Sequence, residues 1–228
     1  WAGAGGEGLV GGRLDYHSWP AIRLGARRAL AMAGKTVNDI NLFDFYSCFP
    51  SAVEIACREL GIAVNDARGL TLTGGLPFLG GPGNNYSMHA IATLVSKLRA
   101  QPTAFGLITA NGGYLSKHAT GIYSATQVLG EWKREDPARC QAEVDAMPSP
   151  QFTETPTGEA RVETYTVVHE RGVPVRGIVI GRLLADDSRF IANTQGDEQT
   201  LAQLLGEEML NRPGVVGADV NGLNLFTF

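Results

Sequence analysis

Apolar residues recur every three to four positions in three stretches of the first 128 residues. The first stretch covers 21–33 and is followed by Gly34, a residue that readily takes the left-handed conformation after a helix. The second begins at Pro50, which is tolerated at a first helical position, and is closed by Gly61. The third covers about 87–100. Its expected buried stripe comprises Met88, Ile91, Leu94, Val95 and Leu98. These patterns predict three helices.

The stretches between these helices have the patterns of strands and loops. Residues 39–46 alternate apolar and polar side chains, as a strand with one covered face does. A second strand is predicted at 104–109, and the chain returns toward 121–123 after a loop that contains Asn111-Gly112-Gly113. Residues 1–20 are glycine-rich and aperiodic and predict a loop. The first 128 residues are therefore expected to form an α/β domain with a layered sheet.

The pattern changes after residue 128. Residues 129–150 are charged and contain proline, which predicts a solvated connector. Between 151 and 228 we expect five short strands, the last two joined at Asn221-Gly222, a strong hairpin signal. One amphipathic helix lies among them, with Leu201, Leu204, Leu205 and Met209 at helical spacing. This pattern predicts an additional β-barrel domain that is OB-like.

Composition excludes several classes of function. The 228 residues carry 19 basic and 23 acidic side chains, and 151–228 has six arginines and no lysine against eleven acidic residues. This balance argues against nucleic acid as a partner, because such binding depends on clustered cations. No apolar run approaches the ~20 residues that cross a bilayer, so no membrane association is expected. The chain begins at Trp1, and we expect it to be part of a longer polypeptide.

The three cysteines lack the spacing of a metal site and are odd in number. We therefore expect no metal, reduced thiols and a cytoplasmic location. Cys57 falls on a helix stripe and is expected in the core, while Cys140 is expected to be an exposed thiol in the connector. Cys48 stands at a strand-to-helix junction, where helix-end amides lower a thiol pKa, although a small buried side chain is the commoner role.

Two histidines have a context suited to acid–base chemistry. His89 lies in the first turn of the third helix, off its apolar stripe and beside small polar residues. His118 follows the Asn111-Gly112-Gly113 segment, where free backbone amides are expected. A histidine is more often structural than catalytic, so both assignments remain hypotheses. The glycines near the N-terminus lack the strand and lysine of a nucleotide-binding loop, which argues against a nucleotide cofactor.

The segment 71–85 is a second candidate for contact with a ligand. It contains Gly75, Gly80 and Gly81 within a dense run of glycines. Such a run is typical of places where the backbone approaches a ligand or another backbone closely. We therefore interpret this loop as functional.

Three motifs in order resemble the C-terminal half of the thiolase superfamily, over residues 21–125. Tyr46-Ser47-Cys48-Phe49 is similar to the family's Asn-Glu-Ala-Phe or His-Asp-Cys-Phe motif. The run from Gly74 to Pro82 is similar to the family's Gly-Gly-(four residues)-Gly-His-Pro. The run from Gly106 to Gly113 is similar to its strand and Cys-x-Gly-Gly loop. The appended β domain looks like that of thiolase-like proteins of type 1, usually of the acetyl-CoA acetyltransferase type.

The resemblance implies a fold of two similar βαβαβαββ halves that acts on acyl-CoA thioesters through an acylated cysteine. That cysteine belongs to the N-terminal half, so this half of the same polypeptide is an implied partner and coenzyme A enters only as the thioester substrate, with no separate cofactor. The implied catalytic side chains are His118, His89, Tyr46 and Cys48. The implied backbone contacts with the thioester lie at Gly75, Gly80, Gly81, Asn111, Gly112 and Gly113.

The chain departs from the family at three positions. Gly81 stands where the family has a histidine, and Ala110 where it has a second cysteine. Tyr46 replaces the first residue of the first motif and is a weaker acid, with an ordinary pKa of ~10. The resemblance therefore leaves two functions open. One is the C-terminal part of an acyl-CoA acyltransferase, and the other is a catalytically degenerate module that binds acyl-CoA or a partner.

Overall fold

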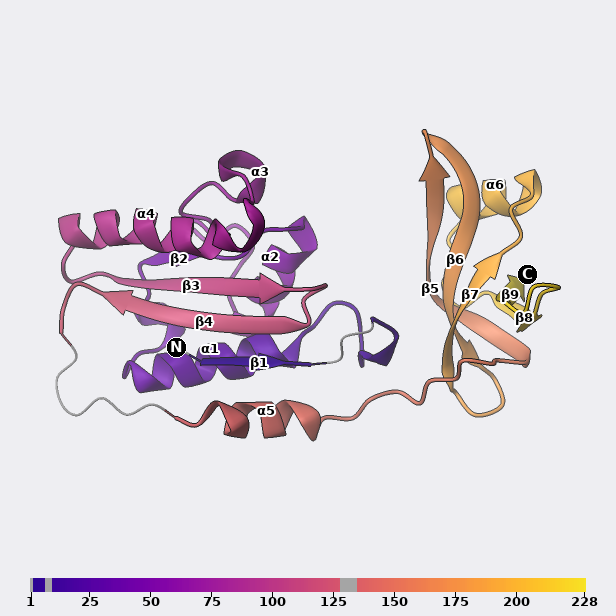
Figure 1. Ribbon diagram of the computed structural model, residues 1–228, viewed down its shortest axis with the longest axis horizontal. Coiled ribbons are helices and arrows are strands. Elements are labelled where there is room, and N and C mark those ends of the chain that lie inside the picture. The colour runs from indigo at the N-terminus through magenta and orange to yellow at the C-terminus, as the bar shows by residue number, and fades with distance from the viewer. Residues whose placement is uncertain (1, 7–9, 128–134) are drawn as a thin grey trace. The chain divides into compact units, whose positions relative to one another are not determined.

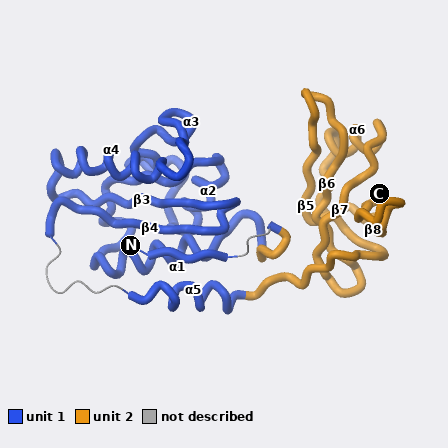
Figure 2. The backbone as a smooth tube through the Cα atoms, in the orientation of Figure 1, with its two compact units in different colours: residues 1–10, 15–147 blue, residues 11–14, 148–228 orange. Residues whose placement is uncertain are grey.

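The computed structural model describes residues 2–6, 10–127 and 135–228. It divides into two compact units, coloured separately in Figure 2. Unit 1 comprises residues 1–10 and 15–147, and unit 2 comprises 11–14 and 148–228. The short segment 11–14 therefore belongs with the C-terminal unit although it lies far from it in sequence.

Unit 1 is built on a four-stranded mixed sheet with the order β1-β4-β3-β2. β1 (Ala2–Gly5) and β3 (Phe105–Gly112) both run antiparallel to β4 (Lys117–Ser124), while β2 (Leu42–Asp44) runs parallel to β3. β1 lies in the stretch predicted as a loop. A Cβ atom on Gly3 would lie 2.5 Å from the backbone oxygen of His118. The close approach to β4 requires small residues in β1. The strand therefore lacks the alternation of apolar and polar side chains that predicts a strand from sequence.

Helices cover both faces of this sheet (Figure 1). α1 (Pro20–Met32) and α2 (Pro50–Leu60) pack on one face, where Ile22, Ala52, Phe43 and Leu107 are buried. α4 (Tyr86–Ala100) packs on the other face against Ile108. The three predicted helices are confirmed, as is the left-handed glycine after α2, because Gly61 has φ 68°.

The predicted buried stripe of α4 is only partly right. The buried residues of the helix are Tyr86, Ala90, Leu94 and Leu98, and Met88 is 62% exposed. The buried face starts at Tyr86, whose hydroxyl is held in a polar network under the helix. Residues four apart share a helix face, so this anchor sets the rest of the stripe and turns Met88 outward.

The connection between β3 and β4 is a tight hairpin closed by residues 113–116. Asn111 pairs with His118 and Gly112 with Lys117, so both belong to β3 and not to the loop predicted there. Of the predicted loop residues Asn111, Gly112 and Gly113, only Gly113, with φ 61°, lies in the turn. The glycine loop 71–85 also contains short helical turns, η3 (Gly83–Asn85) and α3 (Leu76–Leu79). Further 3₁₀ turns are η1 (Val10–Gly12) and η2 (Val37–Asp39).

The segment predicted as a solvated connector contains a helix, α5 (Pro137–Asp145), whose N-cap is Asp136. Cys140 on this helix is 1% exposed, so the expectation of an exposed thiol is wrong. Gln141 accepts a hydrogen bond from the Gly5 amide and donates one to the Gly5 carbonyl, each at 2.8 Å. This side chain satisfies the free edge of β1 as a neighbouring strand would, which ties α5 to unit 1.

Unit 2 contains a closed five-stranded barrel with the order β5-β6-β7-β9-β8. β7 and β9 are parallel and the other pairs are antiparallel. Along the sequence, one helix lies between the third and fourth strands of the barrel. The elements are β5 (Gly158–Glu170), β6 (Val173–Leu183), β7 (Arg189–Thr194), α6 (Glu198–Gly206), β8 (Pro213–Ala218) and β9 (Asn224–Thr227). The predicted OB-like barrel is confirmed, with Phe190 and Phe226 in its core.

The predicted hairpin of β8 and β9 is present, and an acidic side chain closes it. The Asp219 carboxylate accepts hydrogen bonds from the amides of Asn221 and Leu223, both at 2.8 Å. Gly222 has φ 78° and occupies the left-handed position of this turn. The Asn-Gly signal therefore located the turn, while Asp219 supplies its hydrogen bonds.

An ion pair whose arginine is buried fastens residues 11–14 to the barrel. The Arg189 side chain is fully buried and donates two hydrogen bonds to the Glu163 carboxylate, at 2.6 and 2.7 Å. The same guanidinium donates to the carbonyls of Gly11, at 2.8 Å, and of Arg13. These contacts explain why a segment so early in the sequence packs with the C-terminal unit.

Candidate functional site

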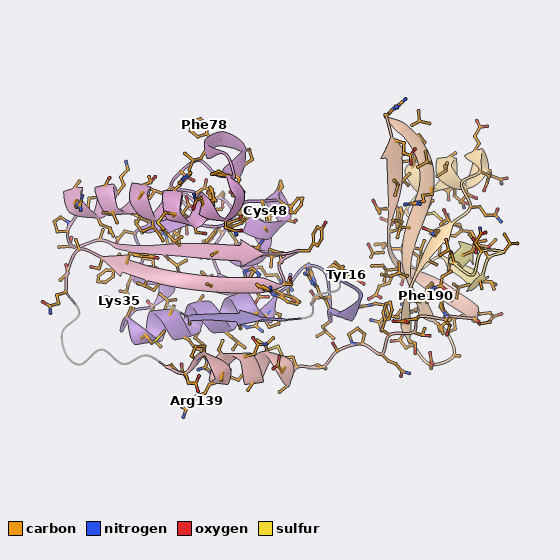
Figure 3. The ribbon with its side chains drawn as sticks, in the orientation of Figure 1. Tyr16, Lys35, Cys48, Phe78, Arg139 and Phe190 are labelled. Carbon is orange, nitrogen blue, oxygen red and sulfur yellow. The ribbon has the colours of Figure 1, made fainter. Side chains whose placement is uncertain are left out.

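The segment that follows β2 carries the first motif, Tyr46-Ser47-Cys48, and leads into α2. The Tyr46 amide donates a hydrogen bond to the Thr109 hydroxyl at 2.8 Å. The Asn111 side-chain amide donates to the Cys48 sulfur at 3.2 Å. Two hydrogen bonds therefore join the first motif to the end of β3, which carries the third motif. Figure 3 labels Cys48 on this segment, and Phe78 on the neighbouring helix α3.

A small cavity lies beside this junction, on the face of the sheet that α1 and α2 cover. Its volume is about 10 Å³, and it is lined by Tyr46, Asn111 and His118 together with Thr109 and Thr120. The Asn111 side-chain oxygen is buried and accepts no hydrogen bond from the residues described. A volume of this size holds one water molecule when polar partners surround it. The cavity is therefore suited to a single water and not to a substrate.

His118 is held within the hairpin. Its Nε2 lies 3.0 Å from the carbonyl oxygen of Leu115, and the residue pairs across the strands with Asn111. Cross-strand partners project to the same face of a sheet. The structure thus brings His118 together with Tyr46, Cys48 and Asn111, four residues that the sequence singled out.

His89 lies on the other side of the sheet. It belongs to α4, which packs on the face that carries Ile108, whereas Asn111 and His118 line the cavity on the α1 and α2 face. Its backbone oxygen accepts a hydrogen bond from the Thr93 hydroxyl at 3.0 Å. Strand residues at odd and even positions face opposite sides, so the sheet itself separates the two imidazoles.

The glycine loop meets the first motif at Gly75. A Cβ atom there would lie 2.9 Å from the Ser47 hydroxyl oxygen, and the backbone takes φ 88°. The Leu76 amide also donates to that hydroxyl at 3.0 Å. Only glycine combines this conformation with so close an approach. The second motif is therefore fixed against the first.

Further along the loop, Gly80 also has φ 88° but is surrounded by open space, and Gly81 is exposed. On the hairpin side, a Cβ on Gly113 would lie 2.4 Å from the Ser116 hydroxyl oxygen. Neither Gly81 nor Ala110, at the positions of the family's histidine and second cysteine, has a side chain that moves a proton. The backbone framework of the three motifs is present without those two side chains.

The sequence analysis missed a buried polar network beneath α4. Asp44 and Tyr86 are fully buried, and Thr73 is 8% exposed. Burial raises the pKa of Asp44, and hydrogen bonds from Thr73 and Tyr86 offset this only in part. Burial also raises the pKa of Tyr86. The signal was a lone aspartate between Phe43 and Phe45, because an acidic residue inside an apolar strand indicates a buried partner.

Two kinds of site are not found in the part of the chain that the structure describes. Within residues 2–6, 10–127 and 135–228, no group of three or more His, Cys, Asp or Glu side chains is placed to hold a metal ion. None of the helices described there has both the length and the apolar character needed to cross a membrane. Cys48, Cys57 and Cys140 are all free thiols, and Cys57 is buried as expected.

Comparisons with known proteins agree with these motifs. Residues 139–221 match the family described as thiolase-like protein type 1 additional C-terminal domain. The whole chain matches the crystal structure of a monomeric SCP2-thiolase-like protein type 1 from Mycobacterium smegmatis, with 41% sequence identity and a TM-score of 0.91. The match covers 100% of this chain and 49% of that one. Comparison with curated proteins gives no match. The resemblance predicted from the sequence is confirmed.

Proposed function

We propose that this relative of thiolase-like protein type 1 is the C-terminal part of an acyl-CoA acyltransferase of the acetyl-CoA acetyltransferase type. The observation that carries the proposal is the meeting of all three motifs at one place. The Ser47 hydroxyl bonds to the start of the glycine loop, and Cys48 bonds to Asn111 of the third motif. The chain spans about half the length of its relative, so an N-terminal half of the same polypeptide completes the site.

In this proposal the N-terminal half supplies the nucleophilic cysteine that accepts the acyl group from the thioester. The chain described here supplies the opposite wall. Backbone amides near Gly81 and Gly113 hold the thioester and its carbonyl oxygen, while the amides of Gly75 and Gly80 donate to Thr73 and Leu76 and shape the loop. Donors placed where negative charge develops are worth ~10²–10³ in rate each. His118, which lies with the first and third motifs, moves the proton, and His89 on the α4 side of the sheet is the alternative. The free thiols fit a reducing, cytoplasmic setting.

A second candidate function is binding of acyl-CoA without transfer. Two observations favour it. Gly81 and Ala110 have no side chain that transfers a proton, and the His118 Nε2 lies within hydrogen-bond distance of the Leu115 carbonyl. In this case the three motifs bind acyl-CoA but do not catalyse acyl transfer. The two candidates differ in whether a thioester is turned over by the complete protein, and they share the prediction that acyl-CoA binds.

Turnover separates the two candidates. In the full-length protein, release of coenzyme A from acetyl-CoA and longer thioesters is measured for His118→Asn, His89→Asn and the double variant. We expect the double variant to lose at least about 100-fold, the ordinary worth of a general acid or base. His169→Asn, at an exposed site on β5, is the matched control and should leave the rate unchanged. An active double variant removes both imidazoles from the mechanism, and absence of turnover in the wild type with measurable binding supports the second candidate.

Measuring the affinity for acetyl-CoA tests whether the glycine loop contacts the ligand, under both candidate functions. Gly75→Ala introduces strain at φ 88° and a contact with Ser47, so acetyl-CoA affinity by calorimetry should fall about tenfold. Gly34→Ala is the matched control, because Gly34 also has a positive φ, 61°, but follows α1 in open space. Equal affinities for these two variants would show that the loop does not contact the ligand.

A further inference from the structure

Three buried side chains form a closed triangle between β2, the glycine loop and α4. The Thr73 hydroxyl lies 2.9 Å from Asp44 Oδ2, and the Tyr86 hydroxyl lies 2.9 Å from Asp44 Oδ1. The third side joins the Thr73 and Tyr86 hydroxyls at 2.8 Å. All three oxygen–oxygen distances fall within the range of O–H···O hydrogen bonds. Each side of the triangle therefore requires one hydrogen atom.

Counting hydrogen atoms gives the protonation state of the triangle. The two hydroxyls carry one hydrogen each, which supplies only two of the three sides. With Asp44 ionised, one pair of oxygens under 3 Å would face each other without a hydrogen between them. With Asp44 protonated on Oδ1, its acid hydrogen goes to the Tyr86 hydroxyl, the Tyr86 hydrogen to the Thr73 hydroxyl, and the Thr73 hydrogen to Asp44 Oδ2. Only the neutral acid completes the ring.

The backbone contacts fit this arrangement without replacing the missing hydrogen. The Thr73 amide donates to Asp44 Oδ2 at 2.9 Å, and the Gly75 amide donates to the Thr73 hydroxyl oxygen at 3.2 Å. Both contacts use lone pairs that the ring leaves free. The Ser47 hydroxyl, beside this ring, accepts from the Leu76 amide at 3.0 Å.

The surroundings of Asp44 hold no opposite charge. β3 presents Ile108 opposite it, the glycine loop presents Thr73, and α4 presents Tyr86. The Tyr46 ring packs edge-on against Tyr86, with centroids 5.2 Å apart. Among the residues described, no cation forms an ion pair with Asp44, and its burial favours the neutral form.

We propose that Asp44, Thr73 and Tyr86 share a buried proton as a closed ring that positions the glycine loop of the thioester site. The ring fixes the end of β2, the Gly75 amide and the first turn of α4 to one another. The first motif follows β2 directly, and the second motif contains Gly75. The positioning role rests on the proposed function, whereas the proton on Asp44 does not. Loss of that proton places a charge beneath the loop and loosens it.

Asp44→Asn is the deciding variant, since a carboxamide has nearly the shape of the neutral acid and an N–H in place of its O–H. In the full-length protein we expect acetyl-CoA affinity within twofold of the wild type at low pH. The wild-type affinity should weaken as the pH rises through the pKa of Asp44, while the variant shows no such dependence. If Asp44 is instead an anion, the wild-type affinity does not weaken as the pH rises through this range. That result, or a variant that does not fold, overturns the proposal.

Infrared spectroscopy reads the proton without any ligand. We expect the wild-type chain to show the carbonyl stretch of a neutral carboxylic acid, absent from Asp44→Asn. No difference in that band between the two proteins refutes the shared proton. If acetyl-CoA does not bind the wild type while the band is present, the proposed function fails and the ring stands.

Tyr86→Phe tests the positioning role, with Tyr123→Phe as its matched control on the same face of the sheet. Tyr86→Phe should raise the dissociation constant of acetyl-CoA at least tenfold and speed amide exchange in residues 73–76, while Tyr123→Phe changes neither. Equal behaviour of the two variants contradicts a role for the ring in the loop.

Discussion

Each unit contains an acidic side chain shielded from water, Asp44 fully buried in unit 1 and Glu163 partly buried in the barrel, and their partners are opposite in kind. In the barrel, Glu163 is held by the guanidinium groups of Arg189 and Arg182. In the sheet of unit 1, Asp44 is held by two hydroxyls and backbone amides. Burial alone would raise both pKa values, but the arginine hydrogen bonds lower the pKa of Glu163, whereas the pKa of Asp44 stays raised.

The difference shows what a buried acid needs in order to remain charged. Removing an ion from water costs several kcal/mol, and only a cation in good geometry offsets this cost. Arg189 provides such a cation and also binds carbonyls of the segment 11–14, so the barrel network acts as a fixed fastener. The network in unit 1 has no cation among the described residues, and its protonation state can change under the glycine loop.

The same type of substitution should cost much more stability at Glu163 than at Asp44. Glu163→Gln leaves Arg189 buried beside a neutral group, and we expect a loss of about 3 kcal/mol of barrel stability. Asp44→Asn should cost less than about 1 kcal/mol, because it replaces one neutral hydrogen-bonding group by another. Hydrogen exchange during denaturant titration measures each unit through its own peptides.

The control for this pair is Glu207→Gln, at an exposed ion pair with Arg212. Its effect should stay under about 0.5 kcal/mol, as for other exposed pairs. Equal losses at Glu163 and Asp44 would remove the distinction between a charged and a neutral network.

Tyr86→Phe should have the next largest effect on stability. It leaves Asp44 Oδ1 buried without its hydrogen-bond partner, which costs about 2 kcal/mol. Tyr123→Phe serves again as the control, since no hydrogen bond of its hydroxyl is found among the described residues, and its loss should be smaller by at least about 1 kcal/mol. Chemical unfolding followed by the fluorescence of Trp19, which lies in the core of unit 1, measures both variants.

The open sheet has free edges and the closed barrel has none, which gives a third contrast. Gln141→Ala removes both hydrogen bonds to the outer edge of β1 and should cost about 1–2 kcal/mol in unit 1. Exchange of the Gly5 amide should rise accordingly, while peptides of the barrel stay unchanged. Gln199→Ala, at an exposed position of α6, is the matched control, and a similar effect there would show that the edge contact is not responsible.

The smallest expected effect is a pair of opposite pH slopes, each below the one-proton limit of about 1.4 kcal/mol per pH unit. The pKa of Glu163 is lowered by folding, so its stabilisation is present above the ordinary glutamate pKa and is lost as the pH falls through the lowered pKa. The pKa of Asp44 is raised, so its contribution is greatest below the ordinary aspartate pKa and is lost as the pH rises through the raised pKa.

Stability of unit 1 measured against pH should therefore lose its downward slope in Asp44→Asn. Stability of the barrel should lose its upward slope in Glu163→Gln. A wild-type unit 1 that gains stability with rising pH across this window would contradict the protonated ring.

Much of this protein follows from local sequence. Helical spacing located α1, α2 and α4, Gly61 ended α2, and the pattern after residue 150 gave the barrel with its last turn at Asn221-Gly222. The three motifs also identified the relatives. Each of these signals lies within a few residues of chain, where backbone conformation and apolar spacing act directly.

The rest depended on contacts between distant residues. Cys140 is buried because α5 covers the edge of β1, and Met88 is exposed because Tyr86 sets the buried face of α4. The sheet separates His89 from His118, which no spacing of histidines along the chain could reveal. The sequence by itself determined the elements and the motifs. Only the tertiary structure decided which side chains meet and which acid keeps its proton, because both depend on the burial and partners that packing creates.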